Sequence, residues 1–188
     1  MSDELHRRRF TVSEYHRMAE AGILDEDDRV ELIEGEIVKM SPIGRKHASH
    51  VDRLTRLFCR RLRDRAIVRV QNPIILGRRS EPQPDFSLLR PKPDFYYSGH
   101  PGPKDILLAL EIADSSLRYD REIKLPLYAK YGIQETWLLI VDRGIVETYR
   151  TPGAQGYGDI QVRERGQRIA AAAFPGVKFA VTDLLGPV

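Results

Sequence analysis

Three charged residues in the middle of the chain have the types and spacing of a metal-dependent hydrolytic site. Asp85 follows Pro84 at the start of an apolar stretch, Glu111 lies inside the apolar run 107–113, and Lys124 follows in a helix-like segment. A carboxylate on a buried strand is costly unless a partner compensates its charge, and a divalent cation held by oxygen ligands is such a partner. We therefore expect Asp85 and Glu111 to bind one Mg²⁺ ion, for which Mn²⁺ could substitute.

The chemistry expected from this set is hydrolysis of a phosphodiester bond. A bound cation lowers the pKa of its water ligand and stabilises negative charge on a phosphate. Lys124 could orient or deprotonate that water, and the backbone carbonyl of Ile112 or Ala113 could add a metal ligand. We expect lesser contributions from Glu36, His50 and Gln83.

Two neighbouring strands must hold the carboxylates. In the strand 106–113, alternation places Glu111 on the face opposite Ile112. A second strand opens at Pro84, directly before Asp85. If these strands pair with their carboxylate faces aligned, both acids can reach one ion. Each of the three charged residues also has an ordinary structural reading, as a loop residue, a partner of an arginine or a solvated side chain.

The remaining pattern predicts a mixed α/β domain with one curved sheet flanked by helices. A hairpin is expected over 29–40 with its turn at Glu34-Gly35, and a long amphipathic helix over 45–65. Arginines face outward from that helix. Arg45, Lys46 and Arg53 are candidate DNA contacts, although a solvated arginine face is an equally simple explanation.

Size and composition restrict the class of protein. The chain has 188 residues and a formal net charge of +3, so we expect one domain over 1–188, with its core at about 29–150. No apolar run approaches the ~20 residues that cross a bilayer, and the charged N-terminus has no apolar secretory segment. We therefore expect a cytoplasmic location and no membrane contact. The single Cys59 excludes an internal disulfide.

The order Pro-Asp, buried acid, lysine resembles the PD-(D/E)XK nuclease superfamily, and more closely the Uma family of restriction-endonuclease-like proteins. The matching residues are Glu31 to Val38, Ser41-Pro42, His47, Pro84-Asp85, Glu111 to Ala113, Ser115-Ser116, Asp120, Lys124, Tyr128-Ala129, Gly132-Ile133 and Glu135 to Trp137. This resemblance implies a restriction-endonuclease-like core, Mg²⁺ dependence, DNA as the partner and often a homodimer.

The lysine departs from the superfamily pattern. That pattern places it two residues after the buried acid, where this chain has Ala113. In the Uma family the lysine comes from the following helix, and for this reason we assign its role to Lys124. Two other functions stay open from the sequence alone: a nuclease-fold module that binds nucleic acid without cutting it, and a protein-interaction or dimerisation module.

Overall fold

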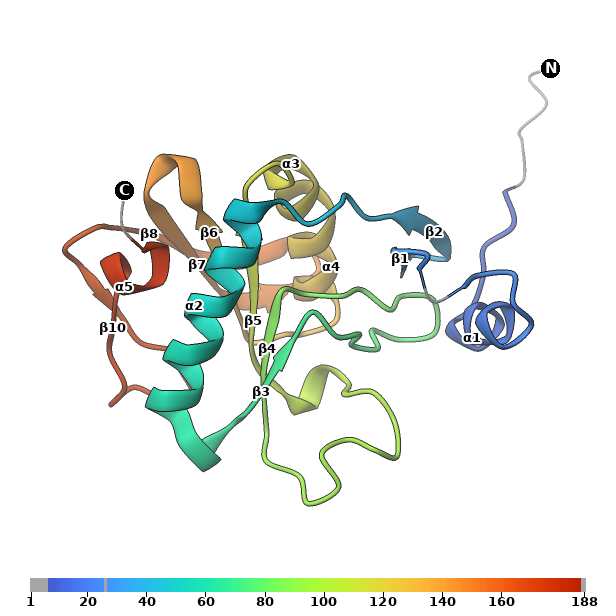
Figure 1. Cartoon of the computed structure of the whole chain (residues 1–188), viewed down its shortest axis with the longest axis horizontal. Coiled ribbons are helices and arrows are strands. Elements are labelled where there is room, and N and C mark those ends of the chain that lie inside the picture. The colour runs from blue at the N-terminus through green and yellow to red at the C-terminus, as the bar shows by residue number, and fades with distance from the viewer. Residues whose placement is uncertain (1–6, 26, 187–188) are drawn as a thin grey trace.

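A six-stranded sheet forms the centre of the molecule (Figure 1). This computed structural model describes residues 7–25 and 27–186. The strands, in chain order, are β3 (Ile67–Val70), β4 (Phe86–Leu89), β5 (Ile106–Ala113), β6 (Glu135–Ile140), β7 (Ile145–Gly153) and β8 (Gly156–Glu164). They also neighbour one another in this order. β5 and β6 run parallel, and the other neighbouring pairs are antiparallel, so the sheet is mixed as predicted.

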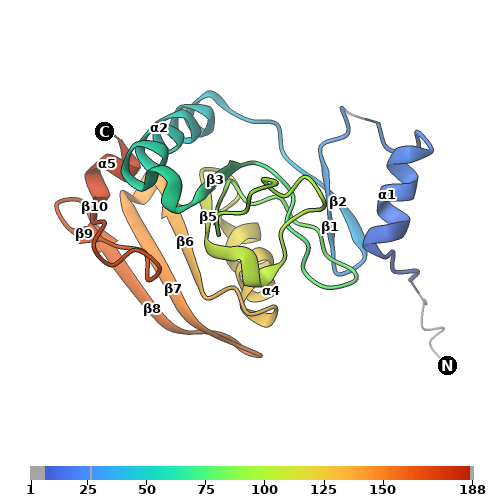
Figure 2. The same cartoon turned by 90° about the horizontal axis from the view of Figure 1, so that it is seen from below.

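Helices cover both faces of this sheet (Figure 2). One face carries α2 (Arg45–Leu62) and α5 (Val181–Leu185), and the other carries the segment formed by α3 (Leu117–Tyr119), η3 (Asp120–Lys124) and α4 (Leu125–Lys130). This segment connects the parallel strands β5 and β6, since parallel neighbours need a crossover rather than a tight turn. The predicted fold class is confirmed.

The buried strand β5 shows the expected alternation. Leu110 and Ile112 pack in the cluster beneath α2, together with Leu54 and Phe58. Ala109 packs instead in the cluster that contains residues of α4. Glu111, one position from each neighbour, therefore faces the side of the sheet on which the α3–α4 segment lies.

The N-terminal part of the chain forms a separate edge of the molecule, away from β8 in both views. It contains α1 (Val12–Glu20) and the hairpin of β1 (Val30–Ile33) and β2 (Glu36–Lys39). Both turn residues of the hairpin, Glu34 and Gly35, have positive φ, as a tight hairpin turn requires. A bridge between Leu32 and Glu81 joins the hairpin to the segment that leads into β4. The hairpin is thereby held near the end of β4 that carries Asp85.

Short elements complete the chain, and none of the helices in its described part is long and apolar enough to span a membrane. These elements are η1 (Arg63–Arg65), η2 (Pro103–Asp105), η4 (Val141–Arg143), β9 (Arg168–Ile169) and β10 (Phe179–Ala180). The last two pair with each other as a small sheet.

The helix that carries Lys124 differs from the sequence prediction. From the sequence, Pro126 is tolerable only near the first turn of a helix, which predicts a helix that starts close to Glu122. In the structure the helical segment begins at Leu117 and contains a π-helical turn, in which the N–H of Leu125 bonds to the carbonyl of Asp120. Pro126 follows shortly after this wider turn and has no N–H to donate to the preceding turn. The helical segment therefore continues through Pro126 to Lys130, and no new helix begins at the proline.

Candidate active site

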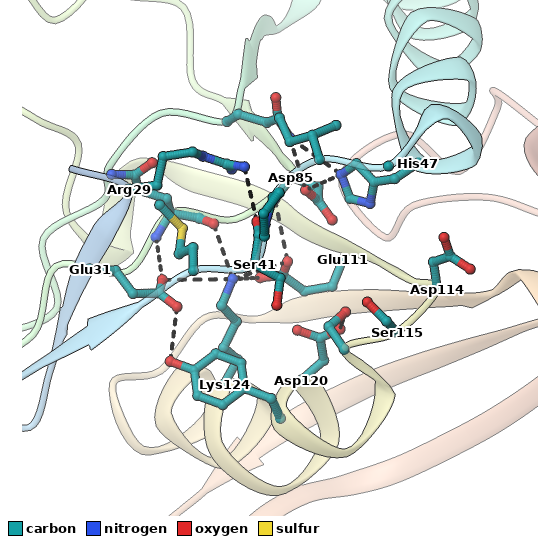
Figure 3. Close-up of a pocket in the computed structure, with 18 of the residues that line it drawn as sticks. Arg29, Glu31, Ser41, His47, Asp85, Glu111, Asp114, Ser115, Asp120 and Lys124 are labelled. Carbon is teal, nitrogen blue, oxygen red and sulfur yellow. Dashed lines mark hydrogen bonds and ion pairs between the residues drawn. The ribbon is translucent and has the colours of Figure 1, made fainter. Parts of the chain in front are cut away.

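Asp85 and Glu111 lie opposite each other at the end of the β4–β5 pair. The register of the pair aligns Phe86 with Leu110, so one further step along each strand brings the two acids together. The backbone N–H of Asp85 lies 3.3 Å from Glu111 Oε2. In return, the N–H of Ile112 donates to Asp85 Oδ2 at 2.8 Å. These reciprocal contacts fix both carboxyl groups at the same place on the sheet (Figure 3).

Glu111 is buried and is held by two side chains from the covering helix. Its side chain is 2% exposed, and the Lys124 ammonium lies 3.2 Å from Oε1 and 3.3 Å from Oε2. The hydroxyl of Tyr128 also donates to Oε1. Burial raises the pKa of Glu111 well above its ordinary value, although the positive charge of Lys124 opposes this shift. The site therefore keeps a carboxyl group out of water, where its charge depends on neighbouring cations.

Lys124 lies at the end of the π-helical turn with its ammonium among oxygen atoms. It donates to the backbone carbonyl of Gln83 at 3.0 Å and lies 3.7 Å from Glu31 Oε2. Burial lowers its pKa, but the attraction of Glu111, Glu31 and other acids outweighs burial and raises the pKa above the ordinary value. The surrounding acids therefore favour the ammonium form of Lys124, which suits a charge-stabilising role.

These three side chains line one cavity of about 330 Å³. They reach it from the residue that precedes β4, from β5 and from the π-helical turn. Gln83 also lines the cavity, and its backbone N–H donates to Glu31 Oε2 at 2.9 Å. The sequence expectation that Asp85, Glu111 and Lys124 lie around a single small space agrees with this geometry.

Two of the lesser candidates lie elsewhere. Glu36 is on the outer side of the hairpin, where Arg9 Nη1 contacts its carboxylate at 2.9 Å, and it does not line the cavity. His50 is also outside the cavity, and its Nε2 lies 3.0 Å from the carbonyl oxygen of Leu185 in α5. Both side chains therefore have structural partners away from the carboxylates.

His47, and not the secondary candidate His50, is the histidine of α2 that reaches the cavity. It lines the cavity, and its Nε2 lies 2.9 Å from Asp85 Oδ1. The hydrogen bond to Asp85 raises the pKa of His47, although burial opposes the shift. Gln71 Nε2 approaches the same carboxylate oxygen at 3.4 Å. The first turn of α2 thus helps to orient Asp85.

Three further acids line the cavity and were not assigned to the site from the sequence: Glu31, Asp114 and Asp120. Glu31, from β1, accepts a hydrogen bond from Tyr119 Oη at 2.8 Å and is only 1% exposed. Asp120 accepts from Ser116 Oγ at 2.6 Å, and burial raises its pKa to about 6, against the opposing effect of Lys124. In the sequence, only the match to the Uma family distinguished Glu31 and Asp120 from other acidic residues. Nothing in the hairpin itself showed that Glu31 points inward.

The basic candidates on α2 lie at different distances from the cavity. Arg45 and Lys46 are exposed in the first turn of the helix, next to Gly44 and His47, which line the cavity. Lys46 is 3.8 Å from Asp142. Arg53 lies about two turns further along the helix and does not line the cavity. Of these three basic candidates, Arg45 and Lys46 therefore border the cavity, and Arg53 does not.

The side chains of the cavity are suited to hold a Mg²⁺ ion, because Asp85 and Glu111 offer carboxylate oxygens. Among residues 7–25 and 27–186, no group of three or more His, Cys, Asp or Glu side chains is arranged as a metal site. Mg²⁺ does not need such a cage, since one or two carboxylates usually hold it together with water and substrate phosphates. Asp85 and Glu111 provide these carboxylates, and each carboxylate oxygen can accept more than one contact.

The architecture places the protein in a class of nuclease-like α/β folds. It is similar to the crystal structure of "a putative nuclease belonging to DUF820" from Anabaena variabilis, with a TM-score of 0.71 over 94% of this chain and 97% of that chain. The two sequences are 18% identical, so the likeness concerns the fold. The chain belongs to the Uma2 family, described as "Putative restriction endonuclease", whose model matches residues 12–182. No curated protein matches this sequence.

Proposed function

We propose that this protein is a Mg²⁺-dependent nuclease that hydrolyses phosphodiester bonds in DNA, with Asp85 and Glu111 as the metal-binding acids and Lys124 beside them. The observation that carries this proposal is the convergence of these three side chains, from three separate elements, on one cavity of about 330 Å³. Membership of a family described as restriction endonucleases supports the same reaction class.

The protein's own groups then have distinct tasks in the reaction. When bound, Mg²⁺ supplies Lewis acidity and lowers the pKa of a water ligand. His47 and the N–H of Ile112 hold the Asp85 carboxylate in place. Lys124 places a positive charge close to the phosphate, which becomes more negative in the transition state. In the hydrolysis, the water oxygen forms a bond to phosphorus, the bond to one ester oxygen breaks, and a water proton passes to the leaving alkoxide.

In this proposal Arg45 and Lys46 contact the phosphates of the DNA backbone. Both are exposed at the mouth of the cavity, so they can neutralise phosphates on either side of the bond that is cut. Phosphate contacts of this kind do not depend on sequence and weaken as salt increases. Arg53 would extend the same contact surface along α2.

Removal of metal provides the test. The purified full chain should cut labelled DNA in the presence of Mg²⁺ or Mn²⁺, should stop when EDTA is added, and should recover when excess metal is returned. A matched series at increasing salt should show binding that weakens with ionic strength. DNA binding without cleavage in either metal would contradict the proposal and favour a nuclease-fold module that only binds nucleic acid.

A further inference from the structure

The hydrolysis proposed for this site needs a group that accepts a proton from the attacking water. The three central residues of the cavity are poorly suited to that task. The acids around Lys124 favour its ammonium form, which has no free electron pair. Asp85 and Glu111 are assigned to the metal, and Glu111 also accepts hydrogen bonds from Lys124 and Tyr128. The other titratable residues of the cavity are therefore the candidates.

Two of these candidates, Glu31 and His47, are engaged by their neighbours. Glu31 Oε1 accepts from the Tyr119 hydroxyl at 2.8 Å, and Glu31 Oε2 accepts from the N–H of Gln83 at 2.9 Å. His47 Nε2 lies 2.9 Å from Asp85 Oδ1, and this contact raises the pKa of His47, which favours its protonated form. Both side chains therefore hold other parts of the site in place.

Asp114 lies on a different side of the cavity from Lys124 (Figure 3). It follows the last residue of β5, and its charge helps to raise the pKa of His47. Asp114 therefore belongs to the side of the cavity that faces α2, away from the helical segment that carries Lys124.

Asp120 has a carboxylate oxygen that remains free within the cavity. It comes from the π-helical turn, four residues before Lys124, so both side chains lie on one face of the helix and line the cavity. Asp120 is 3% exposed, and its Oδ2 accepts from the Ser116 hydroxyl at 2.6 Å. In the described part of the chain, no group donates to Oδ1. Figure 3 shows this carboxylate on the same side of the cavity as Glu111 and Lys124. One oxygen is thus anchored, and the other is available to a water molecule.

The surroundings of Asp120 also suit a proton acceptor. Burial raises its pKa to about 6, against the opposing effects of Lys124 and the Ser116 hydroxyl. An aspartate of this kind is ionised at neutral pH and binds a proton more strongly than an ordinary aspartate, as a general base should. The charged groups that face it are the Lys124 ammonium and the carboxylates of Asp85, Glu31 and Glu111.

We propose that Asp120 accepts the proton of the attacking water in the nuclease reaction. This inference rests on the proposed function and adds a catalytic residue to it. As the water oxygen forms its bond to phosphorus, the proton passes to the free oxygen of Asp120. When the bond to the ester oxygen breaks, the proton passes through water to the leaving alkoxide, and Asp120 returns to its carboxylate form.

The first test replaces Asp120 with asparagine, which can still accept from Ser116 but cannot take up the proton. At saturating Mg²⁺ and neutral pH, kcat for DNA cleavage should fall about 10²–10⁴-fold, the usual contribution of a general base, while KM changes little. Glu122→Gln is the matched control. Glu122 lies in the same π-helical turn but pairs with Arg118 and does not line the cavity, so this variant should cut at the wild-type rate.

The pH dependence of kcat separates a proton acceptor from a structural residue. In the wild type, kcat should fall as the pH decreases through the pKa of Asp120. In Asp120→Asn, kcat should instead keep rising into the alkaline range, because only hydroxide in solution replaces the missing base. Ser116→Ala removes a hydrogen bond that lowers the pKa of Asp120, so its acid limb should move to higher pH. An acid limb that coincides with that of the wild type would contradict the assignment.

Protein stability gives a second measurement, which does not depend on cleavage. The pKa of Asp120 is raised from an ordinary value of 3.8 to about 6, so the folded protein holds this proton more tightly than the unfolded chain. Stability is therefore lost as the pH rises from about 4 to about 6. Asparagine has no proton to lose, so Asp120→Asn should unfold at a higher temperature than the wild type at neutral pH. A lower unfolding temperature would show that the carboxylate serves the fold, and would contradict the inference.

Failure of this inference and failure of the nuclease function give different results. If the wild type cuts DNA and Asp120→Asn cuts it equally fast, Asp120 is not the proton acceptor and the nuclease function stands. If the wild type cuts no DNA in Mg²⁺ or Mn²⁺, the nuclease function is contradicted, and the role of Asp120 with it.

Discussion

Replacing Asp85 with asparagine should leave the protein folded and reduce Mg²⁺-dependent cleavage by about 10³-fold or more. Asparagine keeps the shape of the side chain and an oxygen that can accept from the N–H of Ile112, which donates to Asp85 at 2.8 Å. It removes the negative charge that the ion requires. A catalytic metal stabilises charge by several kcal/mol, and each ~1.4 kcal/mol corresponds to about a tenfold change in rate.

The measurement is the initial rate of cleavage beside a thermal unfolding curve for the same preparation. Asp159→Asn is a matched control, because Asp159 lies on β8 at the opposite edge of the sheet from β3 and does not line the cavity. Its rate and its unfolding temperature should equal those of the wild type. If Asp85→Asn cleaves DNA as fast as this control, Asp85 has no part in holding the catalytic metal.

Replacing Lys124 with methionine should have two large effects. Cleavage should fall about 10²–10³-fold, the usual effect of removing one preorganised group that stabilises transition-state charge. Stability should also fall, by about 3–5 kcal/mol, because Glu111 would be left buried without its positive partner. Chemical denaturation gives the free energy of unfolding, and rates are to be measured where the variant remains folded.

A double variant separates the ion pair from general damage to the core. In Lys124→Met with Glu111→Gln, neither charge remains, so the loss of stability should be clearly smaller than the sum of the two single losses. Additive losses would show that Lys124 and Glu111 do not interact. Cleavage should be absent in the double variant, because Glu111, one of the two proposed metal-binding acids, is then missing.

The central part of the site could be predicted because it depends on short-range patterns. A single acid within the apolar run of β5 is conspicuous, and alternation alone decides which face it occupies. Pro84 lies two residues before β4, which begins at Phe86, and it thereby indicates the approximate position of Asp85. The antiparallel pairing of β4 and β5 then brings the two acids together with few alternatives.

The remaining part of the site depends on contacts that the sequence does not encode locally. His47 and His50 share one stripe of α2, and only the rotation of the helix on the sheet decides that His47 meets Asp85 while His50 meets α5. Glu31 and Glu36 likewise belong to one hairpin. The packing of that hairpin against the end of β4 turns Glu31 inward and leaves Glu36 outside.

The most direct measurement of the central claim is the position of a bound metal. In crystals of the protein soaked with Mn²⁺, the anomalous signal should lie between Asp85 and Glu111, about 2.0–2.6 Å from an oxygen of each carboxylate. The same soak of Asp85→Asn should show no signal there. A manganese ion bound elsewhere in the molecule, or no ion between these two acids at a concentration that supports cleavage, would contradict the account.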